Sequence, residues 1–363
     1  MNMRTAHIVF IWAMIAPFSD AADPIAARYW SEAWAAASAI TNDAQDQATW
    51  QMRVLAAGSG LGLPADELEQ KARQLTGWWK WGALADLAFD LAVRQQTNEA
   101  RRLALEALYK SPLFREDEHD RILLRALWAL AALGDVPLLS EYETRYAGVG
   151  RTAAEVRRAA AIASAVQDGT WSSLSAIDSL PDERSDADTE FRLRLARLVA
   201  ARLKGDERNE WADALWAKTA DTSGYRRIDE RLELIDTFGE FVGPERMRAW
   251  LEQVASDIAN EPAPAYVRAL QWADLAHARA AAGDVAGARA AAGHGRRLAE
   301  QSDGIERPVI LGRVARALSR AGDVSEAEAV FAEALEAARS LENLRPRSIA
   351  LARIYLAQAG VIE

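Results

Sequence analysis

Apolar residues recur along the chain at helical spacing and in the same phase from one segment to the next. Residues spaced i, i+3, i+4 and i+7 share one face of an α-helix, so each such stripe predicts an amphipathic helix. A second stripe follows two of these helices and predicts a partner helix for each. The first stripes are Leu84, Leu87, Ala88 and Leu91; Leu123, Ala126, Leu127 and Leu130; Trp272, Leu275 and Ala276; and Leu311, Val314, Ala315 and Leu318. The second stripes are Ala100, Leu103, Ala104, Ala107 and Leu108; and Ala327, Val330, Phe331, Ala334 and Leu335.

A glycine recurs eleven residues after the start of three of these stripes, and an aspartate follows it each time. Glycine can take the left-handed conformation that ends one helix, and aspartate can accept the free amide hydrogens that start the next. Glu326, three residues after Asp323, predicts a capping box. The sequence therefore predicts helix, tight turn, helix. The near copies are residues 133–136, 282–285 and 321–324, with weaker relatives at Gly169, Gly205, Gly243 and Gly360.

The turns keep a regular interval. From Gly134 onward the spacings are 35, 36, 38, 40, 39 and 38 residues, and residues 58–62 read as an earlier corner. We expect an all-α fold of about eight or nine helix-turn-helix repeats without a convincing strand. Residues 180–188 and 261–264 differ in composition and are candidate longer connections; the first would divide the array into lobes 22–180 and 188–363.

Residues 84–112 and 311–338 resemble the tetratricopeptide repeat (TPR). Small residues stand where that family brings its two helices together, and Phe331 stands at its large hydrophobic position; the small residues are Ala88, Ala315, Ala100 and Ala327. The units at 169, 205 and 243 depart from the pattern, and a period of 37 to 40 exceeds the family's roughly 34. The resemblance implies a right-handed superhelical α-solenoid whose concave groove binds peptides or proteins, with no catalytic residues.

The first 21 residues have the layout of a secretory signal peptide. Arg4 precedes an apolar segment, Pro17 ends it, and Ser19 and Ala21 suit a cleavage site after Ala21. The apolar run, residues 8–18, counts 11 residues, against roughly 20 needed to span hydrocarbon. We therefore expect removal of residues 1–21 and an α-solenoid over 22–363, with an uncleaved anchor as the weaker alternative.

Composition excludes several chemistries. The chain carries 43 Lys+Arg against 53 Asp+Glu, a net charge of −10, which argues against nucleic acid as a partner. It has no cysteine, hence no disulfide, cysteine-ligated zinc, thiol nucleophile or lipid-modified N-terminal cysteine. Its 77 alanines permit close helix approach. Arginine outnumbers lysine 38 to 5, which fits either a GC-rich genome or fixed carboxylate pairs on helix faces.

No motif predicts catalysis, a metal or a cofactor. His119, His277 and His294 form no spaced ligand pair, and the acidic run 116–120 lacks the pattern of a calcium loop. That run suits the start of a helix that begins near Arg121. There is no G-x-S-x-G, S-x-x-K or phosphate loop. The expectation is a protein with no catalytic residue, no metal site and no cofactor.

Tryptophan is the unusual residue, with 13 in the chain. Most are expected to fill gaps between alanine-rich helices. Trp78, Trp79 and Trp81 lie within four positions and cannot all face one way on a helix, since neighbours are about 100° apart. These three are the candidate partner-binding residues, as an anchor for a peptide or a platform for a sugar, against a purely structural role.

These observations predict a non-enzymatic, exported interaction scaffold. It would bind a protein or peptide partner in the bacterial cell envelope, with a periplasmic location and secretion as the alternative. After signal cleavage it would not be an integral membrane protein. The competing hypothesis is an envelope protein that binds or cleaves a glycan, murein or another polysaccharide, with a tryptophan-lined surface.

Overall fold

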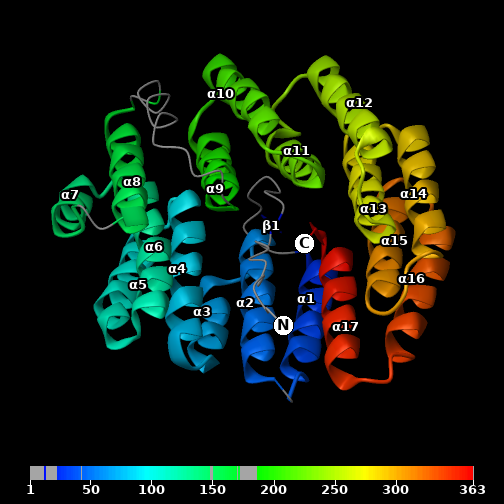
Figure 1. The fold of residues 1–363 in the computed structure, drawn as a ribbon, viewed down its shortest axis with the longest axis horizontal. Helices are drawn as coiled ribbons and strands as arrows, with labels where there is room; N and C mark the ends of the chain where they lie inside the picture. Colours follow the sequence, from blue (N-terminus) through cyan, green and yellow to red (C-terminus); the bar gives the residue numbers. More distant parts are fainter. Residues whose placement is uncertain are drawn as a thin grey trace. The chain divides into compact units, whose positions relative to one another are not determined.

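The computed structural model describes residues 12–13, 23–41, 43–147, 150–169, 171 and 186–362, and nearly all of these are helical (Figure 1). The chain divides into two compact units. Unit 1 comprises Met1–Gly62, Asp186–Ala196 and Leu203–Glu363, and unit 2 comprises Leu63–Ser185 and Arg197–Arg202. The described part contains 17 α-helices, which confirms the all-α prediction. None of them is long and apolar enough to cross a membrane.

Unit 2 contains α3 (Ala65–Gln74), α4 (Gly77–Val93), α5 (Thr97–Lys110), η1 (Ser111–Leu113), α6 (Glu116–Leu133), α7 (Val136–Arg145) and α8 (Gly150–Asp168). Helix α9 (Asp186–Arg202) contributes residues to both units. Unit 1 contains β1 (Trp12–Ala13), α1 (Pro24–Ser38), α2 (Ala44–Gly60), α10 (Gly205–Lys218), η3 (Thr219–Asp221), α11 (Tyr225–Phe238), α12 (Pro244–Asn260), α13 (Ala265–Ala281), α14 (Val285–Ala299), α15 (Glu306–Arg320), α16 (Val324–Arg339), α17 (Leu344–Ala359) and β2 (Val361–Ile362).

The helices pack neighbour to neighbour, as expected of a helical repeat array. Within unit 2, the first helix of each hairpin contacts the next, α4 against α6 and α6 against α8. Within unit 1, the same relation joins α11, α13, α15 and α17. The alanines predicted at helix contacts are buried, which lets the helix backbones approach closely. Those of the two best-matching repeats are Ala88, Ala100, Ala315 and Ala327, each at most 6% exposed.

The last helix packs against the first one, a contact that the repeat pattern does not contain. Tyr29 of α1 stacks on Tyr355 of α17 with 6.3 Å between ring centroids, and its edge meets Phe331 of α16 at 5.8 Å. Asp46 of α2 forms an ion pair with Arg345 of α17. The N-terminal and C-terminal helices of unit 1 therefore form one packed group.

The three Gly-Asp corners share one backbone geometry. The aspartate amide after each glycine donates to the carbonyl five residues earlier, from Asp135, Asp284 and Asp323, at 2.9–3.0 Å. This bond, with the glycine at positive φ, is the Schellman end of a helix. The repeat at residue 84 has glutamine in place of glycine, and Gln95 takes the left-handed conformation with φ 64°. Positive φ also occurs at Gly134, Gly169, Gly205, Gly283, Gly322 and Gly360.

Two predictions about the corners are wrong. Gly243 has φ −63° and ψ 156°, because the ring of the following Pro244 restricts it to extended backbone. The capping box at Asp323 does not form, since both carboxylate oxygens bind Arg289 of the preceding hairpin. Among the three Gly-Asp corners only Asp284 caps its helix with its side chain, accepting from the Gly287 amide at 2.9 Å.

Helix α6 starts at Glu116, five residues before the predicted start near Arg121. The acidic residues at its first turn face the positive end of the helix dipole, which favours this earlier start. Trp12 and Ala13 pair antiparallel with Ile362 and Val361 as two strands of two residues each. The sequence analysis predicted no strand there. The rest of the predicted signal peptide, its cleavage site and most of the predicted connection 180–188 lie outside the described residues.

Candidate functional site

The three candidate tryptophans lie at the start of α4 in unit 2. Trp78 is buried, with Trp79 tilted against it at 3.9 Å between ring centroids. The guanidinium carbons of Arg121 and Arg125 on α6 lie 5.2 and 5.9 Å from the Trp78 ring, within cation–π range. Trp78 therefore joins α4 to α6.

Trp79 and Trp81 are half-buried. The Lys80 ammonium lies 5.3 Å from the Trp81 ring. Parts of both indoles reach solvent, so they are the two members of the trio that a partner can touch. Their role in partner binding stays a prediction.

Other tryptophans pack between helices. Trp30 of α1 donates from Nε1 to the Val54 carbonyl of α2 at 2.6 Å. Trp216 and Trp250 stack almost parallel, with 4.3 Å between centroids. These rings fill space between helices, which is a structural role.

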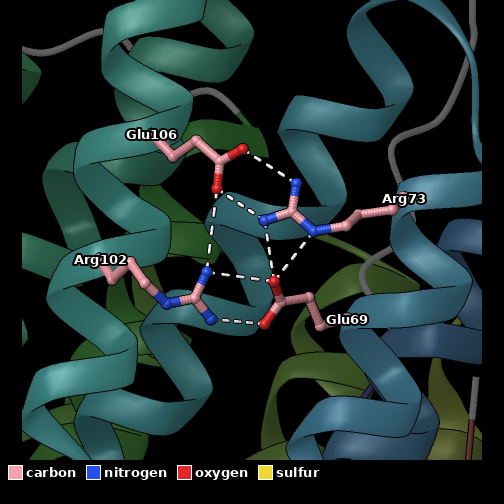
Figure 2. Close-up of polar contacts among 4 residues, drawn as sticks. All are labelled: Glu69, Arg73, Arg102 and Glu106. Carbon is pink, nitrogen blue, oxygen red and sulfur yellow. Dashed lines mark hydrogen bonds and ion pairs between the residues drawn. The ribbon is translucent and has the colours of Figure 1, made fainter.

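Arginine–carboxylate pairs fasten one hairpin to the next. In unit 2, Glu69 and Arg73 of α3 and Arg102 and Glu106 of α5 form a closed network (Figure 2). Arg73 donates to both Glu106 oxygens at 2.9 and 2.7 Å, and Arg102 to both Glu69 oxygens at 3.1 and 2.5 Å. The bidentate bonds lower the pKa of Glu69, through Arg102 first, and that of Glu106, through Arg73 first. All four charges are engaged within the network, so it serves structure.

A denser group of charged and polar side chains lies on the first helices of unit 1. We call it the first-helix cluster. Its members come from α11, α13 and α15, which pack side by side in that order. They are Asp229, Glu233 and Asp236 on α11; Gln271, Asp274 and His277 on α13; and Arg313, Arg316 and Arg320 on α15.

Hydrogen bonds tie the cluster together across the helices. Gln271 Nε2 donates to Oδ1 of Asp229 at 2.8 Å and to the carbonyl of Tyr225 at 3.0 Å. Arg313 binds Asp274 at 2.5 Å. Arg320 Nη1 lies 2.9 Å from His277 Nε2, which makes that nitrogen the acceptor and places the imidazole proton on Nδ1.

Several polar atoms of the cluster have no hydrogen-bond partner. Gln271 is 1% exposed, Asp274 9% and His277 3%. Buried polar atoms are normally paired, so each of these atoms calls for a further partner, either an ordered water or a polar group of a ligand. The unpaired atoms are Glu233 Oε2, Gln271 Oε1, Asp274 Oδ1, His277 Nδ1, Arg313 Nη2 and Arg316 Nε.

Burial changes the ionisation of the acidic members. It raises the pKa of Asp236 to about 6, with Arg320 opposing and Asp274 reinforcing the shift. It raises that of Asp274 to about 6, against Arg313. For Glu233, burial and four neighbouring carboxylates raise the pKa well above its usual range. Protein atoms crowd the Asp229 carboxyl although its surface reaches solvent, and this desolvation raises its pKa as well.

The basic members shift the other way. Burial lowers the pKa of His277 well below its usual range, and Arg320 and Arg316 add to this. The imidazole is therefore neutral near neutral pH, as the bond from Arg320 requires. Burial also lowers the pKa of Arg316. Perturbed groups of both signs on three adjacent helices meet the physical criteria for a functional site.

The other histidines lie apart from the cluster. His119 of α6 bonds through Nε2 to the Tyr146 hydroxyl of α7 at 2.8 Å, and His294 stacks on Trp272 at 4.7 Å. Within the described residues no three histidine or acidic side chains are arranged as metal ligands.

Sequence reasoning did not select the first-helix cluster. Asp229, Glu233 and Asp236 stand at i, i+4 and i+7 and so share a helix face, a signal that the sequence contains. An acidic helix face usually faces solvent, however, and only the packing of the neighbouring helices shows that Glu233 and Asp236 are half-buried here. Comparison of the chain with protein-family models, curated proteins and solved structures finds no match.

Proposed function

We propose that the chain is an exported, TPR-like scaffold that binds a polypeptide partner in the bacterial cell envelope. The observation that carries the proposal is the row of unpaired polar atoms along α11, α13 and α15. Adjacent helices pack about 8–10 Å apart, so a row over three helices extends about 20 Å. A polypeptide with many donors and acceptors would supply the missing hydrogen bonds along that length.

The location is proposed from the sequence of residues 1–21. In a periplasmic fraction, N-terminal sequencing should give Ala22 as the first residue. Recovery of a protein that still begins at Met1 in the membrane fraction would contradict export with cleavage.

Partner binding is tested with the mature chain as bait in gentle envelope extracts. Glu233→Gln and a Trp79→Ala/Trp81→Ala double variant probe the two candidate surfaces. Glu328→Gln is the matched control, because Glu328 is an exposed glutamate on the second helix α16. A partner retained by the control and lost by either test variant supports the proposal. Recovery of no polypeptide, or equal retention by every variant, contradicts it.

A glycan-cleaving activity is the second candidate, and the carboxyls of the cluster favour it. Asp236 and Asp274, each with a pKa of about 6, are protonated enough near neutral pH to act as general acids, the state that glycoside hydrolysis requires. Incubation with murein and acidic polysaccharides tests this. New reducing ends or unsaturated products that disappear in Asp236→Asn would favour the enzyme over the scaffold.

A further inference from the structure

Three exposed apolar side chains follow one another along α5 and η1 in unit 2, and we call them the α5 stripe. Leu105 is 39% exposed, Tyr109 78% and Leu113 74%. Helical residues four apart share a face, so the stripe lies on the side of α5 away from its buried residues. Of the eight large apolar side chains that are exposed in the described residues, three thus lie within residues 105–113. Single exposed apolar residues are ordinary, whereas a contiguous group marks an interaction surface.

The N-terminal end of the α5 stripe carries an exposed arginine. Arg101 stands one turn before Leu105, and its side chain is 59% exposed. Its Nε and Nη2 both bind one oxygen of Asp135, at 3.1 and 3.0 Å. Its Nη1 donates no hydrogen bond to a described residue, so this guanidinium can bind a second carboxylate.

The C-terminal end of the α5 stripe carries exposed carboxylates. Glu116 and Asp117 begin α6 directly after η1, and both side chains are exposed. Arg115, the arginine beside them, binds Glu118 at 3.0 Å. Neither Glu116 nor Asp117 forms a salt bridge with a described residue, so both can accept from a cation outside the chain.

This order along the chain is self-complementary. A twofold axis at Tyr109 places Leu105 of one copy opposite Leu113 of an antiparallel second copy. Arg101 precedes Tyr109 by as many positions as Asp117 follows it, so the same axis brings the arginine end of each copy to the acidic end of the other. Isologous twofold contacts of this kind are the commonest in homo-oligomers.

We propose that two copies of the chain associate through the α5 stripe, with Tyr109 at the twofold axis. The apolar side chains of the two stripes pack together, and Arg101 of each copy binds Glu116 or Asp117 of the other. Three apolar side chains from each copy make a small interface, which suits a dimer that forms and dissociates with concentration.

Self-association goes beyond the proposed function, because it uses neither the first-helix cluster nor Trp79 and Trp81. It would join two partner-binding surfaces in one assembly. A partner with two binding segments would then bind more tightly to the dimer than to one copy, since its second segment binds at a high effective concentration.

The first test is sedimentation velocity of the full mature chain at rising concentration. Wild type should shift from monomer to dimer. Tyr109→Glu should weaken association by at least about tenfold, because it places two like charges at the axis. Tyr266→Glu is the matched control and should not weaken it, because Tyr266 is an exposed tyrosine of unit 1, at the start of α13. Circular dichroism and Tm confirm that both variants fold.

The second test exchanges the charges at the two ends of the stripe. Asp117→Arg and Arg101→Asp should each weaken self-association about tenfold, because like charges would then meet across the axis. An equal mixture of the two variants should restore dimers. In the mixed dimer, the unchanged Arg101 of one copy meets the unchanged Asp117 of the other, and the two introduced residues also have opposite charges.

Three results would overturn the proposal: a wild type that stays monomeric at every concentration, a dimer that Tyr109→Glu leaves intact, or a mixture that associates no better than either charge variant alone. A monomeric wild type whose envelope partner is lost in Tyr109→Glu would assign the stripe to that partner. That result would also overturn self-association while leaving the proposed function intact.

Discussion

Arg313 on α15 binds Asp274 on α13, a residue 39 positions earlier, and both side chains are buried. Arg125 on α6 and Asp86 on α4 form the same pair over the same separation, at 3.0 Å. Each residue stands two positions after the start of its apolar stripe. In both units, an acidic side chain of one first helix thus binds an arginine of the next at equivalent positions.

The Arg313–Asp274 pair should contribute more to the unfolding free energy than the Arg125–Asp86 pair. Asp274→Ala leaves Arg313 buried next to an unfilled space and should cost about 3 kcal/mol of unfolding free energy. Asp86→Ala should cost about 1 kcal/mol, because Asp86 and Arg125 are only half-buried. Urea denaturation of the two variants measures the difference. Equal losses in unfolding free energy would mean that burial does not determine how much such an arginine–aspartate pair contributes.

Asp236 should destabilise the native state near neutral pH. Its folded pKa of about 6 exceeds the ordinary 3.8, so its stabilising contribution is complete below about pH 4 and is lost as pH rises through about 6. Arg320 opposes this shift, and Asp274 and Glu240 reinforce it. Asp236→Asn should raise the unfolding free energy by up to about 3 kcal/mol at pH 7.5 and by little at pH 4.

Urea titration of wild type and Asp236→Asn across this range provides the measurement. The difference in unfolding free energy between the two proteins should grow as pH rises, since only the wild type must ionise a half-buried, desolvated carboxyl. If that difference in unfolding free energy shrank as pH rose, the pKa of Asp236 would be lowered by folding and the prediction would be wrong.

The corner at Gln95 should be strained. Gln95 adopts φ 64°, where an L side chain costs about 1–2 kcal/mol, so Gln95→Gly should raise the unfolding free energy by about 1 kcal/mol. Gly322→Ala introduces the same strain into open space and should destabilise by a similar amount. Gly134→Ala should cost more, because its Cβ would meet Val166 Cγ1 at 3.3 Å. Thermal unfolding of the three variants gives the order.

The network of Figure 2 should respond to salt and acid. Arg73→Gln removes the bonds to Glu106 and Glu69 and should lower stability by about 1 kcal/mol or less, since these groups are partly exposed. The loss should shrink at high salt, which screens exposed charges. It should also shrink below about pH 4, because the lowered pKa values of Glu69 and Glu106 contribute stability that disappears as pH falls through them.

The candidate tryptophans should separate into two classes. Trp78→Ala opens a buried space beneath Arg121 and should cost about 3 kcal/mol. Trp79→Ala and Trp81→Ala should cost less, because both rings are half-buried. If the exposed parts bind a partner, these two variants lose affinity in the bait experiment while their Tm changes little. A large fall in Tm for Trp81→Ala would assign that ring to the core.

The local elements were predictable because their signals are local. The stripe that starts at Leu311, the Gly322 turn and Asp323 lie within one hairpin, and helix periodicity and glycine conformation act over that distance. The same local rules failed where a distant residue intervened. Arg289 of the preceding hairpin binds both oxygens of the Asp323 carboxylate, which therefore does not cap its own helix. A capping rule that considers only residues 321–326 does not include Arg289.

The sequence by itself determined that this chain forms repeated helical hairpins, where they turn, and which alanines lie at helix contacts. Only the tertiary structure shows that Tyr29, near the start of the chain, stacks on Tyr355, near its end. It also shows that Glu233 is surrounded by other carboxylates. Packing depends on which faces of distant helices meet, and the ionisation of a carboxyl depends on the atoms that then surround it. Neither quantity is encoded in spacing along the chain, so the first-helix cluster emerged only from the folded arrangement.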